Sequence, residues 1–139
     1  APVKLCFGIA NRSAAIRIPK YVNNELEKRI EYRPPDGTCN VYLAIAAQLM
    51  AGIDGILNKI DPEKLGYGPF EGNLFEIQSE QIQSIQALPS SLKEAIDELQ
   101  KDHDFLLRNN VFNTNMLNKE YEDMMKRPHP YEMALYFDL

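Results

Sequence analysis

The chain has 139 residues, a mass of 15.9 kDa and a formal net charge of -5. This length suits one ordinary domain, and a hydrophobic content of 45% is sufficient for a packed core. The acidic balance gives no sign of a nucleic-acid-binding surface, which would need clustered Lys and Arg, so an anionic ligand would have to be held by a local group of arginines.

Three short strands are predicted near the beginning of the chain, where apolar and polar side chains alternate. They cover Ala1–Phe7, Ala14–Pro19 and Lys28–Arg33, and a polar loop over Tyr21–Glu27 joins the last two. The Pro-Pro-Asp-Gly sequence at residues 34–37 ends the third strand. Because the chain begins at an Ala that opens directly into a strand-like run, we expect it to be part of a longer polypeptide.

A long helix is predicted from about Cys39 to Ile60, with Thr38 or Asn40 as its N-cap. Its first turns are apolar nearly all round, which is typical of a helix buried on several sides. We therefore expect more surrounding structure than this chain alone provides. The apolar stretch Val41–Leu57 contains Gln48 and Asp54, so we interpret it as a buried helix of a soluble protein and not as a membrane span.

The remaining residues predict a loop followed by helices. Residues 61–89 are rich in Gly, Pro and polar side chains and predict a long loop with a short turn near residues 71–76. Ser91 and Glu94 form a capping box that opens an amphipathic helix, which residues 102–107 continue. Asn113 or Thr114 caps a further helix, and the apolar tail Tyr131–Leu139 is predicted to be helical. The pattern indicates one α+β domain over residues 1–139, with a few antiparallel strands followed by a helical C-terminal region.

The two cysteines, Cys6 and Cys39, lie among apolar or small residues and lack metal-ligand spacing. We expect reduced thiols that act as small core residues in a cytoplasmic protein. No basic region followed by an apolar run begins the chain, so we also expect no secretory signal.

The candidate binding site in the sequence consists of one carboxylate and several arginines. Glu31 lies between Arg29 and Arg33 on one face of the third predicted strand, Arg17 comes from the second strand, and Arg12 from the turn before it. Guanidinium forks bind phosphate oxygens, and a carboxylate can hold the divalent cation that bridges phosphates. The alternative is a solvated strand face with cross-strand ion pairs, each worth about 0–1 kcal/mol. A glycine-rich phosphate-binding loop is absent from the sequence.

Several motifs resemble those of the glutamine synthetase family, in the same order along the chain. Residues 1–3 and 11–19 resemble the A-P-V and N-R-S-A-x-I-R-I-P signatures, and residues 29–36 resemble R-I-E-x-R-x-P-D. Residues 40–44 resemble N-P-Y-L-A, and residues 49–60 resemble L-M-A-G-L-D-G-I-x-N-K-I. Residues 88–95 and 128–132 also match, so the resemblance covers the whole chain.

The resemblance implies ATP-dependent ligation of ammonia to glutamate through γ-glutamyl phosphate, with ATP as substrate and Mg²⁺ or Mn²⁺ as the ion. Arg12 and Arg33 would be the catalytic and substrate-binding residues. Arg12 would contact the transferring phosphoryl group, and Arg33 would hold the glutamate carboxylate or acyl phosphate. Arg17 and Arg29, with Arg12, would bind the nucleotide, and Glu31 would ligate the metal ion.

Departures from the family pattern limit these expectations. The family's flap Glu would precede Ala1, as would the metal ligands other than Glu31, so we expect the chain alone to be inactive. Ala10 replaces a frequent Arg, Gly37 and Val41 replace common prolines, and a nucleotide-contacting Lys of some members aligns near Leu26. At the position of a tyrosine that is adenylylated in some bacterial members, the chain has Phe75, which has no hydroxyl. We therefore predict no adenylylation there.

The expected partners are glutamate, ammonia and ATP, within a homo-oligomeric ring of the family type, and neither nucleic acid nor a membrane. Two alternatives stay open at the level of sequence. A γ-glutamyl ligase that uses a polyamine or another amine would share the same ATP and glutamate residues. A non-catalytic domain that uses this surface for assembly would account for the missing ligands.

Overall fold

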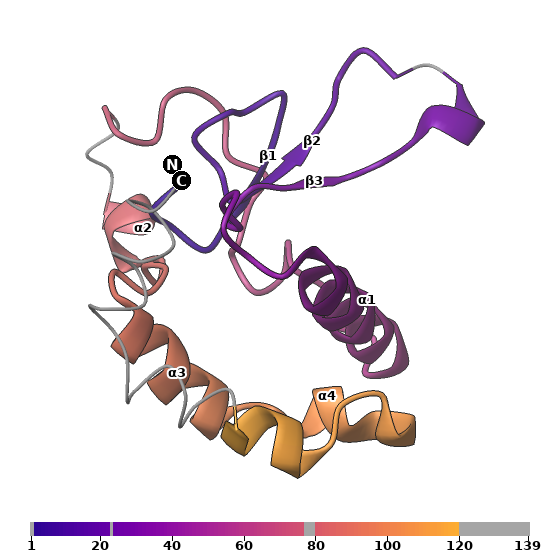
Figure 1. The fold of residues 1–139 in the computed structure, drawn as a ribbon. Coiled ribbons are helices and arrows are strands. Elements are labelled where there is room, and N and C mark those ends of the chain that lie inside the picture. Colours follow the sequence, from indigo (N-terminus) through magenta and orange to yellow (C-terminus); the bar gives the residue numbers. More distant parts are fainter. Residues whose placement is uncertain (1, 23, 77–79, 120–139) are drawn as a thin grey trace, which may run out of the picture. The chain divides into compact units, whose positions relative to one another are not determined.

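The computed structural model describes residues 2–22, 24–76 and 80–119, and the chain order of its elements can be followed in Figure 1. These elements are β1 (Phe7–Ile9), β2 (Ile16–Ile18), η1 (Glu25–Glu27), β3 (Glu31–Tyr32), α1 (Val41–Leu57), α2 (Glu80–Ser84), α3 (Leu92–Lys101), α4 (Asp104–Leu107) and η2 (Arg108–Asn110). The combination of strands and helices confirms the α+β prediction.

The sheet is mixed, with the order β1-β2-β3. β2 and β3 are antiparallel, as expected, but β1 and β2 are parallel, with Phe7 opposite Ile16, so the expectation of purely antiparallel strands is wrong for this pair. A short parallel connection is possible because each strand has only three residues. Such a strand spans about 10 Å, and residues 10–15 are long enough to return the chain from the end of β1 to the beginning of β2.

The first predicted strand is displaced along the chain. β1 begins at Phe7, whereas residues 3–5 run antiparallel to residues 86–88, where Leu5 N donates to the Gln86 carbonyl at 2.9 Å and Leu88 N to the Val3 carbonyl at 2.9 Å. The predicted loop over residues 61–89 therefore includes a pairing segment, and also the short helix α2. The third strand is shorter than predicted, because only Glu31 and Tyr32 enter the ladder.

Local capping sets the beginnings of the helices. The Asn40 side-chain oxygen accepts from Tyr42 N at 3.1 Å and Leu43 N at 3.2 Å, so Asn40 and not Thr38 caps α1. Ser91 caps α3 by accepting from Glu94 N at 3.2 Å, as predicted. The chain from residue 102 does not continue α3, since Asp102 is its C-cap and α4 begins at Asp104.

A further helix begins after Asn113, whose side chain accepts from Met116 N at 2.9 Å, so Asn113 is the cap and residues 114–119 are helical. The rest of that predicted helix, and the predicted C-terminal helix Tyr131–Leu139, lie outside the described residues.

The chain divides into two compact units. The first comprises Ala1–Ile45 and Gly55–Leu88, and its core is formed by Cys6, Ala14, Leu74, Ile82 and Ile85, against which Phe70 packs. The second comprises Ala46–Asp54 and Pro89–Leu139, and its described buried side chains are Met50, Ile96, Leu106 and Phe112.

The two cysteines differ in their surroundings. Cys6 is a core residue, as predicted, and burial raises the pKa of its thiol. Cys39 is exposed in the turn before α1, so the prediction of a core thiol is wrong there. None of the helices in the described part of the chain is long and apolar enough to cross a membrane.

Candidate functional site

The register of the antiparallel pair brings Arg17 and Glu31 together. They are directly opposite each other on β2 and β3, and Arg17 Nη1 lies 2.7 Å from Glu31 Oε2. A hydrogen bond between ionised groups at this distance is among the stronger polar contacts in proteins. The Arg17 hydrogen bond holds the pKa of Glu31 below its ordinary value, and the charges of Arg17, Arg29 and Arg33 lower it further. Glu31 is therefore ionised at neutral pH.

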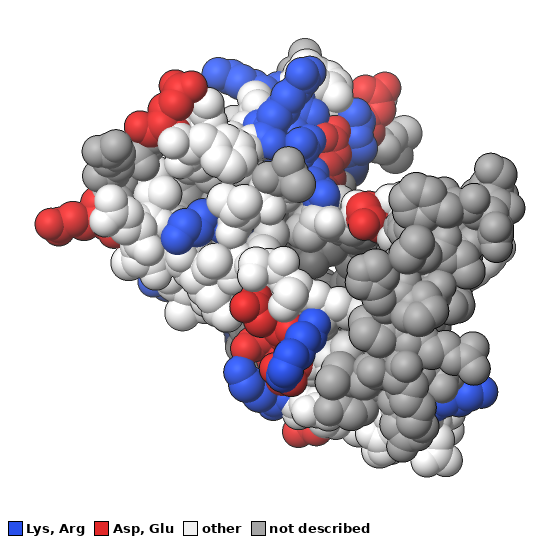
Figure 2. Space-filling model, turned by 60° about the vertical axis from the view of Figure 1, so that its left-hand side comes forward, with Lys and Arg blue, Asp and Glu red and all other residues white. Residues whose placement is uncertain are grey.

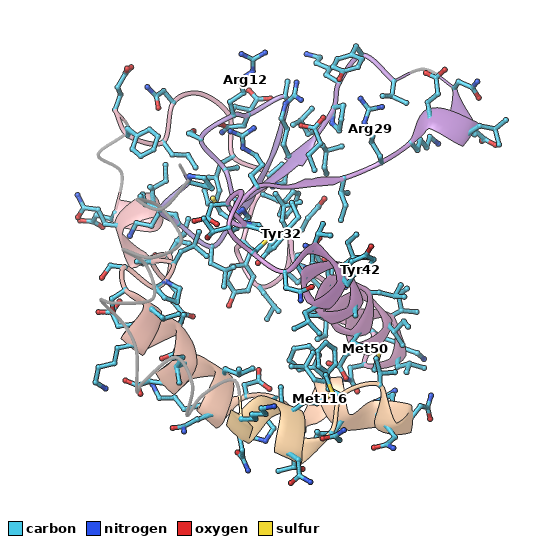
Figure 3. The ribbon with its side chains drawn as sticks, viewed as in Figure 1. Arg12, Arg29, Tyr32, Tyr42, Met50 and Met116 are labelled. Carbon is cyan, nitrogen blue, oxygen red and sulfur yellow. The ribbon has the colours of Figure 1, made fainter. Side chains whose placement is uncertain are left out.

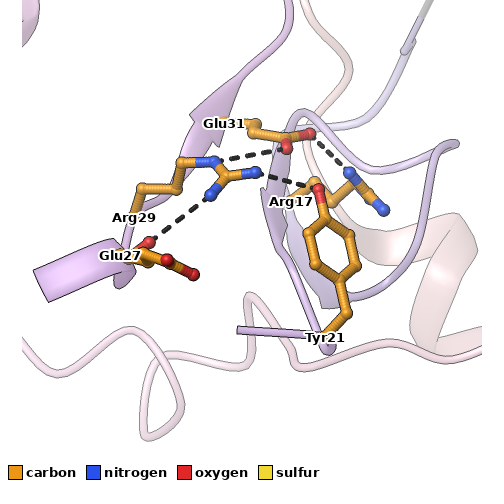
Figure 4. A network of polar contacts seen from close by, with 5 residues as sticks. All are labelled: Arg17, Tyr21, Glu27, Arg29 and Glu31. Atoms are coloured by element: carbon orange, nitrogen blue, oxygen red, sulfur yellow. Dashed lines mark hydrogen bonds and ion pairs between the residues drawn. The ribbon is translucent and has the colours of Figure 1, made fainter. Parts of the chain in front are cut away.

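Arg29 approaches the other oxygen of the same carboxylate, as Figure 4 shows. Its Nε lies 3.9 Å from Glu31 Oε1, its Nη1 donates to the Glu27 carbonyl at 3.4 Å, and its Nη2 donates to the Tyr21 hydroxyl at 2.9 Å. The Tyr21 ring also lies near both guanidinium groups, with centroid distances of 5.8 Å to Arg17 and 5.6 Å to Arg29. Both distances fall within the range of cation–π attraction.

Arg33 extends the group along β3. Its backbone N donates to the Ala15 carbonyl at 2.9 Å, which fixes the strand beside the turn into β2. The Nε atoms of Arg33 and Arg17 are both buried and have no hydrogen-bond partner among the described residues. A buried donor without an acceptor is unfavourable, because it has lost its hydrogen bonds to water. An acceptor from a bound anion would remove this penalty, so the two arginines fit a phosphate or carboxylate ligand.

Positive charge exceeds negative charge in this group. Arg17 and Arg29 contact the single carboxylate of Glu31, and the charge of Arg33 also lowers the pKa of Glu31. We call Arg17, Arg29, Glu31 and Arg33 the arginine cluster. Figure 2 shows Lys and Arg side chains gathered around acidic atoms near the top of the view. An excess of guanidinium groups favours the binding of a multiply charged anion.

Arg12 is positioned by a different set of contacts. Asn11 is buried, and its side-chain oxygen accepts from Ser13 N at 2.9 Å and Ser13 Oγ at 2.6 Å, while its Nδ2 donates to the Phe70 carbonyl at 3.0 Å. The Ser13 hydroxyl accepts from Leu74 N at 3.0 Å. These bonds tie the turn that carries Arg12 to residues 70–74.

Arg12 itself is exposed and lines an open hollow of about 550 Å³ together with Asn73 and Phe75. Figure 3 shows its side chain directed outward from the turn. Arg12 is not among the described residues that contact Glu31 or lower its pKa. The structure therefore brings together three of the four predicted arginines around the carboxylate and places the fourth beside the hollow.

The described residues supply only part of a metal site. No group of three or more His, Cys, Asp or Glu within these residues could hold a metal ion. Mg²⁺ requires about six oxygen ligands, and Glu31 offers one carboxylate that already contacts Arg17. The arginine N–H groups of this cluster thus fit a phosphate-bearing anion. For a divalent ion the cluster provides one ligand group, the carboxylate of Glu31.

Two residues with a part in this geometry were missed at the level of sequence. In the sequence, Tyr21 stands in a polar loop, and Asn11 stands at the start of the motif over residues 11–19. The available signal for Tyr21 was an aromatic ring four residues after Arg17, in a loop that returns the chain to β3. For Asn11 the signal was its place two residues before Ser13, a spacing that permits an Asx turn.

The fold agrees with the comparisons to known proteins. The chain belongs to the glutamine synthetase catalytic-domain family, because the family described as "Glutamine synthetase, catalytic domain" matches residues 1–136. Among curated relatives, the glutamine synthetase of Aquifex aeolicus is 45% identical over 146 residues, covering 100% of this chain and 30% of the relative. The glutamine synthetase of Frankia alni is 42% identical, with the same coverage of both proteins.

A solved structure gives the same relationship. The cryo-EM structure of Plasmodium falciparum glutamine synthetase superposes with a TM-score of 0.63 at 28% identity, covering 98% of this chain and 34% of that one. The chain therefore spans about 30% of the length of the curated relatives that it matches.

Proposed function

We propose that the full-length protein containing this chain ligates ammonia to glutamate with ATP, and that the arginine cluster binds the phosphates. The observation that carries the proposal is the contact of Arg17 and Arg29 with one ionised carboxylate, beside the buried and unpartnered Nε of Arg33, in a member of the glutamine synthetase family. Phosphoryl transfer depends mainly on positioning and charge stabilisation, which such guanidinium groups supply.

The reaction has two steps in this proposal. The γ-carboxylate of glutamate attacks the terminal phosphorus of ATP, ADP leaves, and γ-glutamyl phosphate forms. Ammonia then attacks the carbonyl carbon of the acyl phosphate, phosphate leaves with the electrons of the broken C–O bond, and the nitrogen gives up a proton. Arg17 and Arg29 bind nucleotide phosphates, Arg12 contacts the transferring phosphoryl group, and Arg33 holds the glutamate carboxylate or the acyl phosphate.

Glu31 has two functions in the proposal. It orients Arg17 and Arg29 through the contacts described above, and it offers one ligand to a divalent ion, Mg²⁺ or Mn²⁺. Such an ion would supply charge neutralisation between the phosphates. Its remaining ligands would come from outside the described residues.

We further propose that residues 1–139 form the C-terminal portion of one catalytic domain, in a cytoplasmic, ring-shaped homo-oligomer. The match of a single family over residues 1–136 supports the assignment to one domain. The many exposed apolar side chains of α1 support additional protein surface around it. These are Val41, Tyr42, Ile45, Leu49, Ile56 and Leu57.

The test is ATP-dependent phosphate release by the full-length protein with glutamate and either ammonium or a polyamine. We expect release that depends on ammonium, yields glutamine, and is lost in Arg33→Ala. Arg108→Ala is the matched control, because Arg108 contacts Asp54 at 3.6 Å and lies outside the arginine cluster. This variant should retain wild-type activity.

The alternatives give different results in the same assay. Release with a polyamine and not with ammonium would assign the protein to the related γ-glutamyl ligases. No release with either amine would contradict both ligase assignments and favour an assembly function. Equal losses of phosphate release in Arg33→Ala and Arg108→Ala would argue against the proposed binding of phosphates by the arginine cluster.

A further inference from the structure

Tyr21 holds a position between two arginines of the cluster that the proposed reaction leaves unexplained. It lies three residues beyond the end of β2, in the loop that leads toward β3. Its ring is near the guanidinium groups of both Arg17 and Arg29, and its hydroxyl accepts a hydrogen bond from Arg29 (Figure 4). No other described aromatic ring makes a cation–π contact with the cluster.

The two arginines depend on Tyr21 to different degrees. Arg17 is well fixed, since its side chain is 13% exposed and its ion pair with Glu31 measures 2.7 Å. The Arg29 side chain is 47% exposed, and its ion pair with Glu31 measures 3.9 Å. Its hydrogen bond to the Glu27 carbonyl is long at 3.4 Å, so the 2.9 Å bond to Tyr21 is the shortest of these three contacts.

An exposed arginine loses much rotational freedom when it binds a ligand. A contact that restricts the side chain beforehand reduces this loss and so strengthens binding. The hydroxyl of Tyr21 fixes one Arg29 nitrogen, and its ring restricts the plane of the guanidinium group. These contacts would keep Arg29 beside Arg17, in spite of the repulsion between two like charges.

We propose that Tyr21 is a positioning residue that preorganises Arg29, and to a lesser extent Arg17, for binding the phosphates of ATP. The inference rests on the proposed function and adds to it a residue that acts through the arginines. Tyr21 should therefore affect the KM for ATP much more than kcat or the KM for glutamate.

The test uses steady-state kinetics of the full-length protein with Tyr21→Phe and Tyr21→Leu. Tyr21→Phe removes the hydroxyl and keeps the ring, and we expect the KM for ATP to rise about 2- to 5-fold. Tyr21→Leu removes both contacts, and we expect a rise of about 5- to 20-fold. The KM for glutamate should stay within about 2-fold of wild type in both variants.

Two further variants make the test specific. Tyr32→Phe is the matched control, because Tyr32 follows Glu31 on β3 and its side chain is on the opposite face of the strand. It should leave the KM for ATP unchanged. In an Arg29→Ala background, Tyr21→Phe should have almost no additional effect on the KM for ATP, since the residue that it positions is gone.

The possible failures can be told apart. A wild-type protein without ATP-dependent glutamine formation overturns the proposed function and with it this inference. An active wild type whose Tyr21→Phe variant has an unchanged KM for ATP overturns the inference alone. A Tyr21→Phe effect of equal size with and without Arg29, or equal increases in both KM values, would also overturn it.

Discussion

At the scale of single residues, the pairing of Arg17 with Glu31 connects local structure to charge. Each residue is on a very short strand, and the register between β2 and β3 alone decides that they face each other. Cross-strand pairs of opposite charge stabilise an antiparallel ladder. The same contact keeps Glu31 ionised and holds Arg17 in place, so folding and the proposed binding site share one interaction.

The lowered pKa of Glu31 predicts a pH-dependent contribution to stability. Because the folded-state pKa is below the ordinary value of 4.5, the contribution is fully present above about pH 4.5 and is lost as pH falls through the folded-state pKa. We expect Glu31→Gln to lower the Tm at pH 7 in metal-free buffer, and the difference from wild type to shrink below pH 4.5. Thermal unfolding across this range is the measurement. A difference that grows toward low pH would contradict the assignment.

Gly8 on β1 is required by close packing. A Cβ at this position would lie 2.5 Å from the Phe70 carbonyl oxygen and 2.6 Å from Asn11 Cβ. We predict that Gly8→Ala lowers the free energy of unfolding by about 1–3 kcal/mol, measured by thermal or urea unfolding. Gly37→Ala is the control, since a Cβ there meets no atom within 4 Å. Equal stability of the two variants would show that this packing is not restrictive.

Phe75 carries a prediction about modification. It is 60% exposed and borders the hollow beside Arg12, but it offers no hydroxyl for nucleotide transfer. We expect no mass increase on this segment after incubation of the full-length protein with a bacterial adenylyltransferase. Phe75→Tyr is the positive control, which restores the acceptor oxygen. An added nucleotide on the wild-type segment would refute the prediction.

At the scale of elements, the sequence predicts those features of helices and strands that depend on residues close together in the chain. The Ser91 cap of α3 could be predicted, and the cap of the helix over residues 114–119 could be narrowed to Asn113 or Thr114, because each capping bond spans three residues. The face shared by Arg29, Glu31 and Arg33 followed from the alternation of side chains along an extended segment.

Pairings between distant segments could not be predicted in the same way. The contact of residues 3–5 with residues 86–88, and the parallel pairing of β1 with β2, depend on the return path of the chain. The sequence also groups Arg12, from the turn before β2, with the carboxylate. The hydrogen bonds of Asn11 to Ser13 and Phe70 instead hold the Arg12 turn beside residues 72–75.

The N-cap of α3 gives a prediction for a whole element. Ser91 Oγ accepts from Glu94 N at 3.2 Å, and Ser91→Ala leaves that donor without its partner. We expect a loss of about 1 kcal/mol in the free energy of unfolding. Ser91→Asn keeps a capping oxygen and should remain within a few tenths of a kcal/mol of wild type. Urea unfolding of both variants checks this, and an equal loss in both would speak against a capping function.

At the scale of the whole molecule, the described part of the chain contains the arginine cluster that we propose to bind phosphates, and no group of three or more His, Cys, Asp or Glu there could hold a metal ion. We therefore expect residues 1–139 alone to form no glutamine from glutamate, ammonium and ATP above a blank without protein. The full-length protein, assayed in parallel, is the positive control. Glutamine formation by the isolated chain would contradict the proposed dependence on additional ligands.

The hydrogen bonds that join Asn11 and Ser13 to the segment over residues 70–74 limit how this segment can be replaced by the corresponding segment of a related protein. Both bonds use main-chain atoms of the segment, the Phe70 carbonyl and the Leu74 amide. The path of that segment is therefore fixed more strictly than its side chains are. Replacement by a segment of the same length that keeps the core side chains Phe70 and Leu74 should leave Arg12 in position, whereas a one-residue insertion would move the turn that carries it.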